Sequence, residues 1–322
     1  MIEAFGLSKR YGAKTAVDDV SFTVQPGKVT GFLGPNGAGK STTMRMIVGL
    51  DNPTSGRVLV NGKPYAQHRA PLREAGALLD AKAVHTKRSA YNHLRAMAAT
   101  HGISTKRVNE VIDLTGLAPV ARKRVGGFSL GMGQRLGIAA ALLGDPQTVI
   151  LDEPVNGLDP EGVLWVRHLA RGLAAEGRTV FLSSHLMSEM AQTADHLIVI
   201  GRGRIIADAP ITEIIAGRDK IRTVVRTDSP RELLEAVAGQ AVADGAVTGV
   251  EKEPGLLEFI GAQPRAIAEA ALARQILVYE LTPQHVSLED AYMELTRDDV
   301  EYRSQDLPQE LVPAGSTAEK GN

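Results

Sequence analysis

A glycine-rich segment near the N-terminus constrains this 322-residue chain more than any other feature. Residues 34–42 read Gly-Pro-Asn-Gly-Ala-Gly-Lys-Ser-Thr, which fits the pattern Gly-x-x-x-x-Gly-Lys-Ser/Thr. Glycine has no Cβ, so successive backbone N–H groups can curl inward around an anion. The apolar run 29–33 precedes the segment and the helical pattern 42–49 follows it. The sequence therefore predicts a strand, a phosphate-binding loop and a helix whose positive end faces the phosphates.

The two polar residues that follow the last glycine give this loop its chemistry. Lys40 adds a full positive charge toward the β- and γ-phosphate oxygens of a bound triphosphate, and the Ser41 hydroxyl is placed to bind Mg²⁺. The alternative, a glycine-rich turn that arose by chance, is disfavoured by the strand before the loop and the helix after it. The residues expected to bind the triphosphate are Gly34, Pro35, Asn36, Gly37, Ala38, Gly39, Lys40, Ser41 and Thr42.

Two adjacent carboxylates follow a second buried-strand pattern much further along the chain. Residues 148–154 read Thr-Val-Ile-Leu-Asp-Glu-Pro, so Asp152 and Glu153 come at the end of the strand. Ligands of α/β sheets bind at the carboxyl ends of the strands. We expect Asp152 to support the Mg²⁺ shell and Glu153 to polarise an attacking water. An acidic turn after a strand is common by itself, but its pairing with the glycine-rich loop favours the catalytic interpretation.

Short apolar runs alternate with longer helical patterns over residues 1–218. The runs at 29–33, 148–151, 179–182 and 197–200 are continuous enough to be buried on both faces of a mostly parallel sheet. The alternation of strands and helices predicts an α/β fold.

Two other stretches of this region predict smaller subdomains. Residues 54–62 are strand-like and end in Asn61-Gly62, a hairpin signal, so we expect a small antiparallel sheet beside the main one. Residues 86–145 are mostly helical in pattern, with glycine breaks, and predict a helical subdomain.

The C-terminal part of the chain predicts a separate, smaller unit. Strand and helix patterns over 219–300 follow the order βαββαβ, which is typical of a ferredoxin-like α+β domain. The tail 301–322 is polar and we expect it to be disordered. The predicted division is therefore 1–218, 219–300 and 301–322.

Composition excludes several classes of function. The chain has 36 Lys and Arg residues against 37 Asp and Glu residues, a net charge of −1, so we expect no nucleic acid partner. It has no cysteine, which excludes disulfide scaffolds, thiolate zinc sites, iron–sulfur clusters and thiol catalysis. The first residues lack the apolar core of a signal peptide, and no run approaches the roughly 18 apolar residues of a membrane span. We expect a cytoplasmic protein that reaches a membrane only through a partner.

Taken together, the motifs resemble the nucleotide-binding subunit of an ABC transporter over residues 2 to about 215. Residues 128–135, Phe-Ser-Leu-Gly-Met-Gly-Gln-Arg, match the signature segment of that family, and residues 157–160, Gly-Leu-Asp-Pro, match the loop after its catalytic glutamate. His185, after the run Phe-Leu-Ser-Ser, matches the switch histidine. Tyr11 matches the aromatic residue that stacks on adenine in the family.

The resemblance implies a P-loop NTPase fold and a head-to-tail dimer that holds two ATP molecules, with Mg²⁺, between its subunits. Glu153 and His185 would be the catalytic residues, because the histidine would hold the γ-phosphate and orient the water together with the glutamate. Asp159 would link the two sites across the dimer. The signature residues that would face the γ-phosphate bound by the other subunit are Ser129, Gly131 and Met132.

The sequence departs from the common family pattern at two places. Leu130 and Met132 stand where many members have Gly and Gln, and this form of the signature resembles drug and antibiotic exporters. Asp80 follows the strand pattern 75–79, at the position where a Gln or Glu usually senses the membrane partner. Aspartate is shorter than glutamate, so its reach to Mg²⁺ would need an extra water, and a plain loop residue is the alternative.

The segment 286–296 resembles the closing segment of exporter ATPases of the daunorubicin and bacitracin resistance type. Its apolar residues recur at helical spacing. Two interpretations remain open: a helix for docking or dimer stabilisation, and a helix that packs on its own small domain.

We therefore expect the ATPase subunit of an exporter for a drug, an antibiotic or another lipophilic compound. Its partners would be a second ATPase subunit and a separate membrane permease, which would hold it at the inner face of the cell membrane. One alternative is a soluble ABC-type ATPase of translation or DNA repair, but the chain has one cassette and no coiled-coil insertion. The other is a module that binds ATP without hydrolysing it, which intact Lys40, Asp152, Glu153 and His185 disfavour.

Overall fold

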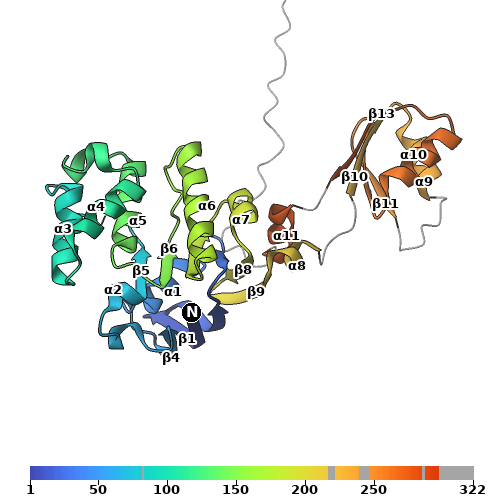
Figure 1. The fold of residues 1–322 in the computed structure, drawn as a ribbon. Coiled ribbons are helices and arrows are strands. Elements are labelled where there is room, and N and C mark those ends of the chain that lie inside the picture. Colours follow the sequence, from blue (N-terminus) through green and yellow to red (C-terminus); the bar gives the residue numbers. More distant parts are fainter. Residues whose placement is uncertain (82, 217–221, 239–246, 285–286, 297–322) are drawn as a thin grey trace, which may run out of the picture.

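The computed structural model describes residues 1–81, 83–216, 222–238, 247–284 and 287–296. In Figure 1 a central sheet lies between a layer of helices and a second, antiparallel sheet. The strand order of the central sheet is β5-β6-β7-β3-β8-β9. The neighbours from β5 to β8 pair in parallel, and β9 is antiparallel to β8. The bounds are Ala75–Leu78 for β5, Thr148–Leu151 for β6, Thr179–Ser184 for β7, Val29–Leu33 for β3, His196–Gly201 for β8 and Arg204–Pro210 for β9.

The middle strands of this sheet are covered on both faces. Every residue of β3, β6 and β7 is buried, in agreement with the mainly apolar sequence of these strands. Alternate residues enter different cores: Ile150 and Phe181 face the antiparallel sheet and α1 (Lys40–Ile47), whereas Val149 and Val180 face the helices. The predicted α/β fold with a mostly parallel sheet is confirmed.

An aromatic cluster joins the central sheet to the second sheet. The ring centroids of Phe32 and Phe181 lie 5.1 Å apart, and Phe22 of the antiparallel sheet lies 6.0 Å and 5.8 Å from them. Rings at this separation pack favourably beyond the apolar area that they bury. Phe32 belongs to β3, the strand that leads into the glycine-rich loop, so the cluster packs this strand against the second sheet.

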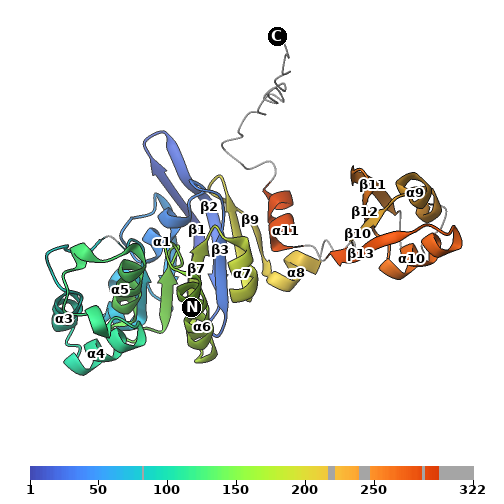
Figure 2. The same cartoon turned by 90° about the horizontal axis from the view of Figure 1, so that it is seen from above.

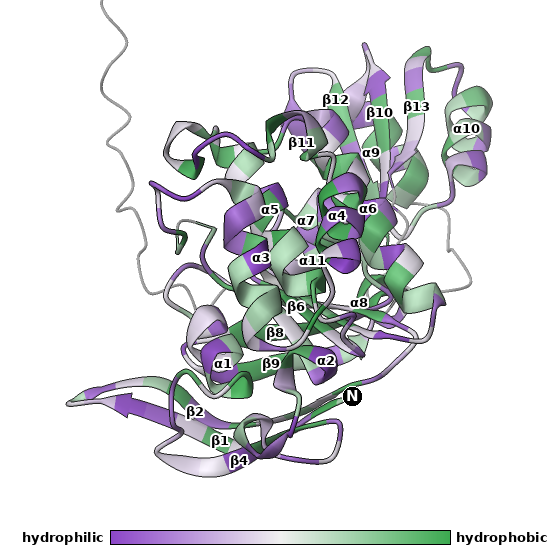
Figure 3. Cartoon of the chain, turned by 60° about the vertical axis from the view of Figure 1, so that its left-hand side comes forward, coloured by the Kyte–Doolittle hydropathy of each residue, from purple (hydrophilic) through white to green (hydrophobic). Residues whose placement is uncertain are grey.

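The second sheet is antiparallel, as predicted, and its strand order is β2-β1-β4. Its strands are β1 (Ile2–Tyr11), β2 (Lys14–Val24) and β4 (Ser55–Val60), and in Figure 3 hydrophilic residues colour much of the edge strand β2. One hairpin of this sheet joins β1 to β2. The predicted turn at Asn61-Gly62 also forms, because Val60 and Lys63 on either side of it exchange backbone hydrogen bonds of 2.8 Å and 3.2 Å. Both turn residues have positive φ, of 50° and 81°, and the Asn61 side chain contacts the N-terminal amino group and Glu74.

The predicted helical subdomain consists of α3 (Ala90–Thr100), α4 (Thr105–Leu114) and α5 (Leu130–Leu142). A serine precedes each helix and accepts a hydrogen bond from a backbone N–H of its first turn; these caps are Ser89, Ser104 and Ser129. Such caps satisfy N–H groups that have no partner inside the helix. Two longer connections contain short helices. The connection before β5 contains η1 (Tyr65–Gln67) and α2 (Pro71–Glu74), and the connection before α5 contains η2 (Ala118–Val120) and η3 (Val125–Gly127).

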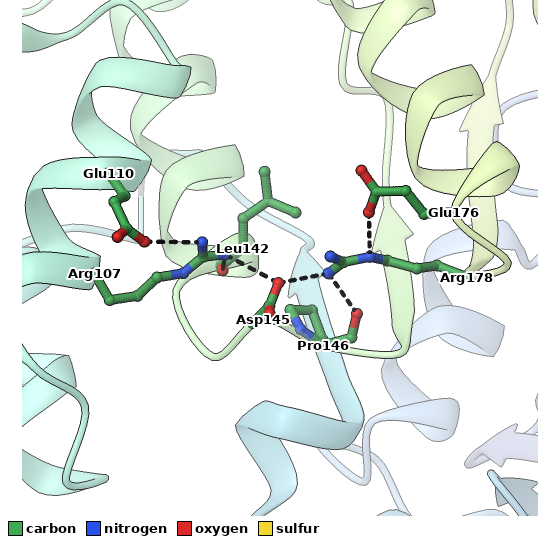
Figure 4. Close-up of polar contacts among 7 residues, drawn as sticks. All are labelled: Arg107, Glu110, Leu142, Asp145, Pro146, Glu176 and Arg178. Carbon is green, nitrogen blue, oxygen red and sulfur yellow. Dashed lines mark hydrogen bonds and ion pairs between the residues drawn. The ribbon is translucent and has the colours of Figure 1, made fainter.

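A charged network ties the helical subdomain to the rest of the core, as Figure 4 shows. Asp145 follows α5 and accepts hydrogen bonds from Arg107 of α4 at 3.2 Å and from Arg178, just before β7, at 2.8 Å. Arg107 also reaches the Leu142 carbonyl at 2.9 Å, and Arg178 contacts Glu176 at 2.9 Å. One carboxylate thus joins two parts of the molecule that are distant in the sequence.

The C-terminal unit has the predicted order βαββαβ. Its strands form an antiparallel sheet in the order β11-β12-β10-β13, and its helices pack on one face of that sheet over a core of their own (Figure 2). This is the arrangement of a ferredoxin-like domain. The bounds are Arg222–Thr227 for β10, Pro230–Ala238 for α9, Thr248–Glu253 for β11, Leu256–Ile260 for β12, Pro264–Ala273 for α10 and Val278–Gln284 for β13.

The last helix, α11 (Leu288–Leu295), packs on the nucleotide-binding part of the chain. It contacts α7 (Met187–Thr193) and α8 (Ile211–Ala216), and Figures 1 and 2 both show it beside α8. Its buried residues Leu288, Ala291 and Tyr292 belong to the same core as Met190 and Ile214. The interpretation in which this helix packs on its own small domain is therefore not what the contacts support.

Other predictions on the domain organisation stay predictions. The boundaries at 218 and 300, Val286 of the closing segment and the tail 301–322 all fall outside the described residues.

Candidate functional site

The glycine-rich loop connects β3 to α1 and is shaped by close contacts that exclude side chains. A Cβ on Gly34 would clash with the carbonyl oxygen of Ile200 in β8. Gly39, which directly precedes α1, has a φ of 110°, and a Cβ there would lie 2.6 Å from the Ala16 carbonyl oxygen. Only glycine fits both positions without strain, so the loop backbone can lie flat against β2 and β8.

Lys40 is enclosed by this loop. Its ammonium donates hydrogen bonds to the carbonyl oxygens of Gly34 at 2.6 Å and Pro35 at 3.3 Å, and the side chain is buried. Burial lowers the pKa of Lys40, and the charges of Glu153 and Asp152 oppose that shift. A partly desolvated cation therefore sits at the mouth of the loop and faces two carboxylates.

The two carboxylates follow β6 and are held by the neighbouring strand β7. The hydroxyl of Ser183 donates to Asp152 Oδ1 at 2.5 Å and accepts the backbone N–H of Glu153 at 2.8 Å. Glu153 adopts a left-handed conformation with φ of 49°, which is uncommon for a residue with a side chain. Gln134 of α5 donates to the Glu153 carbonyl at 3.1 Å, so the strained residue is fixed from both sides.

His185 follows β7 and contacts the second carboxylate. Its Nδ1 lies 2.7 Å from Glu153 Oε2, and its side chain is 49% exposed. The pair forms because β6 and β7 are parallel neighbours, whose carboxyl ends meet at the same edge of the sheet.

The loop and the carboxylates border one open pocket. The residues that line it are Tyr11, Lys14, Ala16, Asn36, Gly37, Gly39, Lys40, Ser41, Thr42, Asp152 and Glu153. The structure thus brings Tyr11, most of the expected phosphate-binding residues and both expected carboxylates together, with His185 reaching Glu153 from the side.

The signature residues do not line this pocket within the described part of the chain. Ser129 caps α5 by accepting the backbone N–H of Met132 at 3.2 Å, and Gly131 lies in the first turn of that helix. The side chain of Leu130 packs beside Gly157, in the loop that follows Glu153.

Two further predicted residues, Asp159 and Asp80, are not among the residues that line the pocket. The Asp159 side chain accepts the backbone N–H of Gly162 at 2.9 Å and so caps α6 (Pro160–Ala175). Asp80 is exposed just beyond β5, the neighbour of β6, at the same edge of the sheet as Asp152.

Several residues of this site had no predicted role. Ser183 lies inside a strand pattern, and Gln134 lies within the quoted signature segment, where only Ser129, Gly131 and Met132 were assigned a function. Lys14, which lines the pocket beside Tyr11, had no signal that distinguished it from an ordinary strand residue.

Within the residues that the structure describes, none of the helices combines the length and apolar character that crossing a bilayer requires.

Comparisons with known families agree with this geometry. The family described as ABC transporter matches residues 17–156, which include the loop, the signature segment and both carboxylates. Residues 222–289 match a domain of unknown function.

Relatives and solved structures cover most of the chain. It is 35% identical over 300 residues to the uncharacterized ABC transporter ATP-binding protein YhcH of Bacillus subtilis, covering 92% of this chain and 96% of YhcH. It is 41% identical over 217 residues to the bacitracin transport ATP-binding protein BcrA of Bacillus licheniformis, covering 66% of this chain and 71% of BcrA. A solved ATP-binding subunit of an ABC transporter superposes with a TM-score of 0.62 and 28% identity, over 67% of this chain and 92% of that structure. The chain therefore belongs to the ATP-binding proteins of the ABC transporter family.

Proposed function

We propose that this ATPase powers the export of an antibiotic or a related lipophilic compound through a separate membrane permease. The pocket, where Lys40 and the glycine-rich loop face Asp152 and Glu153, supports the ATPase activity on which the proposal rests. The similarity to the bacitracin transport protein BcrA supports the class of cargo. A soluble ATPase without a transport partner is disfavoured, because the relatives are named as transport proteins.

The loop and the helix behind it bind the triphosphate. The backbone N–H groups of the loop and the N-terminus of α1 offer donors to the β- and γ-phosphates, and Lys40 adds its charge. The Ser41 hydroxyl and the Asp152 carboxylate border the same pocket, and such hard oxygen ligands suit Mg²⁺. The ion would neutralise charge that develops on the phosphate oxygens.

Glu153 accepts the proton of the attacking water, and His185 controls when it can do so. A neutral imidazole that donates Nδ1–H to Glu153 has a bare Nε2, which cannot donate to a phosphate oxygen. The ring must therefore gain a proton or turn away from Glu153 when ATP binds. A second proton would leave the Nδ1–H contact to Glu153 in place, whereas turning the ring away frees the carboxylate for water. In the second case nucleotide binding and activation of the base are coupled.

The signature residues act on the nucleotide of a second copy. Ser129 and Gly131 lie outside the pocket of their own chain, at the N-terminus of a helix that can face an anion. ATP-binding subunits of this family dimerise and work with a membrane permease. In this chain the dimer would be head to tail, with Asp159 between the two sites.

Light scattering tests the dimer. The Glu153→Gln variant, which keeps the pocket but loses the base, should be a monomer alone and a dimer with Mg-ATP. A monomer under both conditions would contradict the sandwich arrangement. The matched control is Glu189→Gln, on α7 outside the pocket, which should hydrolyse ATP and not accumulate the dimer.

Antibiotic susceptibility tests export. The chain is co-expressed with its permease in a sensitive host, and the host's tolerance of bacitracin-type peptides is compared with that given by Lys40→Ala. Tolerance that depends on Lys40 supports the proposal. Equal tolerance with both chains, across peptide and lipophilic antibiotics, would contradict export of these compounds.

A further inference from the structure

The aromatic ring that borders the pocket is held by charged neighbours. Tyr11 ends β1, its ring is 49% exposed, and its hydroxyl donates a hydrogen bond to Asp51 Oδ2 at 3.0 Å. An exposed tyrosine ordinarily samples several rotamers. Here the hydrogen bond to Asp51 holds the hydroxyl, and the backbone of β1 holds the other end of the side chain. The ring can therefore adopt fewer orientations.

Asp51, which accepts this hydrogen bond, is itself held in place by Arg45. Arg45 donates to Asp51 Oδ2 from Nε at 2.8 Å and to Oδ1 from Nη2 at 3.4 Å, and the Asp51 side chain is only 18% exposed. The hydrogen bond from Arg45 is the main reason that the pKa of Asp51 is lowered. Asp51 therefore stays an ionised acceptor at neutral pH. Arg45 lies in α1, the helix that begins with Lys40, and its carbonyl oxygen also accepts the Asp51 backbone N–H at 3.3 Å, so Asp51 is held to the helix of the phosphate loop.

A second cation covers one face of the same ring. Lys9 Nζ lies 5.1 Å from the centroid of Tyr11 and also donates to the Asn52 carbonyl at 2.6 Å. Cation–π contacts of this length are attractive. Tyr11 lines the pocket and Lys9 is not among its lining residues. We place the nucleotide base on the face of the ring that Lys9 does not cover.

We propose that Asp51 and Lys9 are positioning residues that hold Tyr11 as a platform on which the purine base stacks. This inference rests on the proposed function, in which Tyr11 contacts adenine. A ring that is already ordered loses less conformational freedom on binding, so more of the stacking free energy appears as affinity. Asp51 and Lys9 do not line the pocket, so we expect them to act through the Tyr11 ring and not through direct contact with the phosphates.

Calorimetry with two ligands separates base from phosphate. Mg-ADP carries the base and is not hydrolysed, whereas Mg-pyrophosphate fills only the phosphate loop. In the full chain, Asp51→Ala and Tyr11→Phe should each raise the Kd for Mg-ADP roughly threefold to tenfold, and Lys9→Met roughly twofold to fivefold. The Kd for Mg-pyrophosphate should not change. The double variant Tyr11→Phe with Asp51→Ala should bind Mg-ADP no more weakly than Asp51→Ala alone, since both remove the same contact.

The C-terminal unit offers a matched control. Tyr279 donates to Asp228 at 3.2 Å in a similar exposed pair outside the pocket, so Asp228→Ala should leave both affinities unchanged. Unchanged Mg-ADP binding by Asp51→Ala and Tyr11→Phe would overturn the inference. A parallel loss of Mg-pyrophosphate binding would overturn it too, because the residues would then act through the loop. A wild-type chain that binds neither ligand would instead contradict the proposed function.

Discussion

At the scale of single residues, the site depends on a strained glutamate held by uncharged partners. Glu153 has φ of 49°, and its backbone is fixed by Ser183 on one side and Gln134 on the other. Strain of this kind persists only where the surroundings over-determine the conformation, and it is concentrated at functional sites. The carboxylate is thereby aimed along the edge of the sheet toward His185 and the phosphate loop.

The role of the carboxylate itself is tested by Glu153→Gln. We expect this variant to bind ATP but to hydrolyse it at least about a hundredfold more slowly, because a general base typically contributes that much. Steady-state phosphate release, with binding measured separately, gives both quantities. Turnover at the wild-type rate would remove Glu153 from the mechanism.

Ser183→Ala tests the support behind the carboxylates. It removes the donor to Asp152 and the acceptor of the Glu153 N–H, so we expect kcat to fall about tenfold and unfolding to become about 1–3 kcal/mol easier. The control is Ser184→Ala. Its hydroxyl accepts only the Leu186 N–H among the described contacts, at 2.9 Å, so kcat should change much less. Equal kcat values for the two variants would show that Ser183 has no special role.

At the scale of elements, the helical subdomain shares a hydrophobic core with the central sheet, and one carboxylate between two guanidinium groups adds a polar contact to that packing. Hydrogen bonding to Arg178 is the main reason that the pKa of Asp145 is lowered in the folded state. A carboxyl whose folded pKa lies below its unfolded value stabilises the protein at pH values above the unfolded value, near 4. That contribution is lost as the pH falls through the lowered folded pKa.

Asp145→Asn should therefore destabilise the chain in a pH-dependent way. We expect a loss of about 0.5–1 kcal/mol at pH 7, a modest figure because the Asp145 side chain is 59% exposed and screened by solvent. The difference from wild type should shrink as the pH is lowered through 4 toward 3. Urea unfolding at several pH values measures it, with Asp113→Asn, an exposed carboxylate on α4, as the control. A difference that is the same at every pH would contradict the ionic origin.

The last helix makes a second prediction at this scale. Tyr292 is 8% exposed in the same core as α7, so Tyr292→Ala should lower the stability of the nucleotide-binding part by roughly 3 kcal/mol. Its neighbour Met293 is 62% exposed, and Met293→Ala should change stability by less than about 0.5 kcal/mol. Thermal unfolding with and without Mg-ADP measures whether the nucleotide-binding part of each variant unfolds at a lower temperature. Equal melting temperatures for Tyr292→Ala and Met293→Ala would mean that α11 does not stabilise this core.

At the scale of the whole molecule, features with a local signal were predictable and features made by distant contacts were not. The buried strands and the phosphate loop could be identified because their patterns lie within a few neighbouring residues. The order βαββαβ of the C-terminal unit followed from the same kind of pattern.

Other features could not be predicted, because they depend on pairing in space. Ser183 holds the carboxylates only because β6 and β7 are neighbours. Asp145 meets Arg107 and Arg178 across the fold. The helical spacing of α11 gave its apolar face correctly, but it could not tell which surface that face would meet.

The central claim is that the loop ahead of Ser41 binds a triphosphate opposite Asp152 and Glu153. Calorimetric titration of Mg-ATP into the Glu153→Gln variant tests it most directly, because hydrolysis then adds no heat. We predict saturable binding of one nucleotide per chain, weakened more than about tenfold by adding Lys40→Ala, since a charge-assisted contact is lost. No binding at all, or binding that is equally tight without Lys40, would contradict the account.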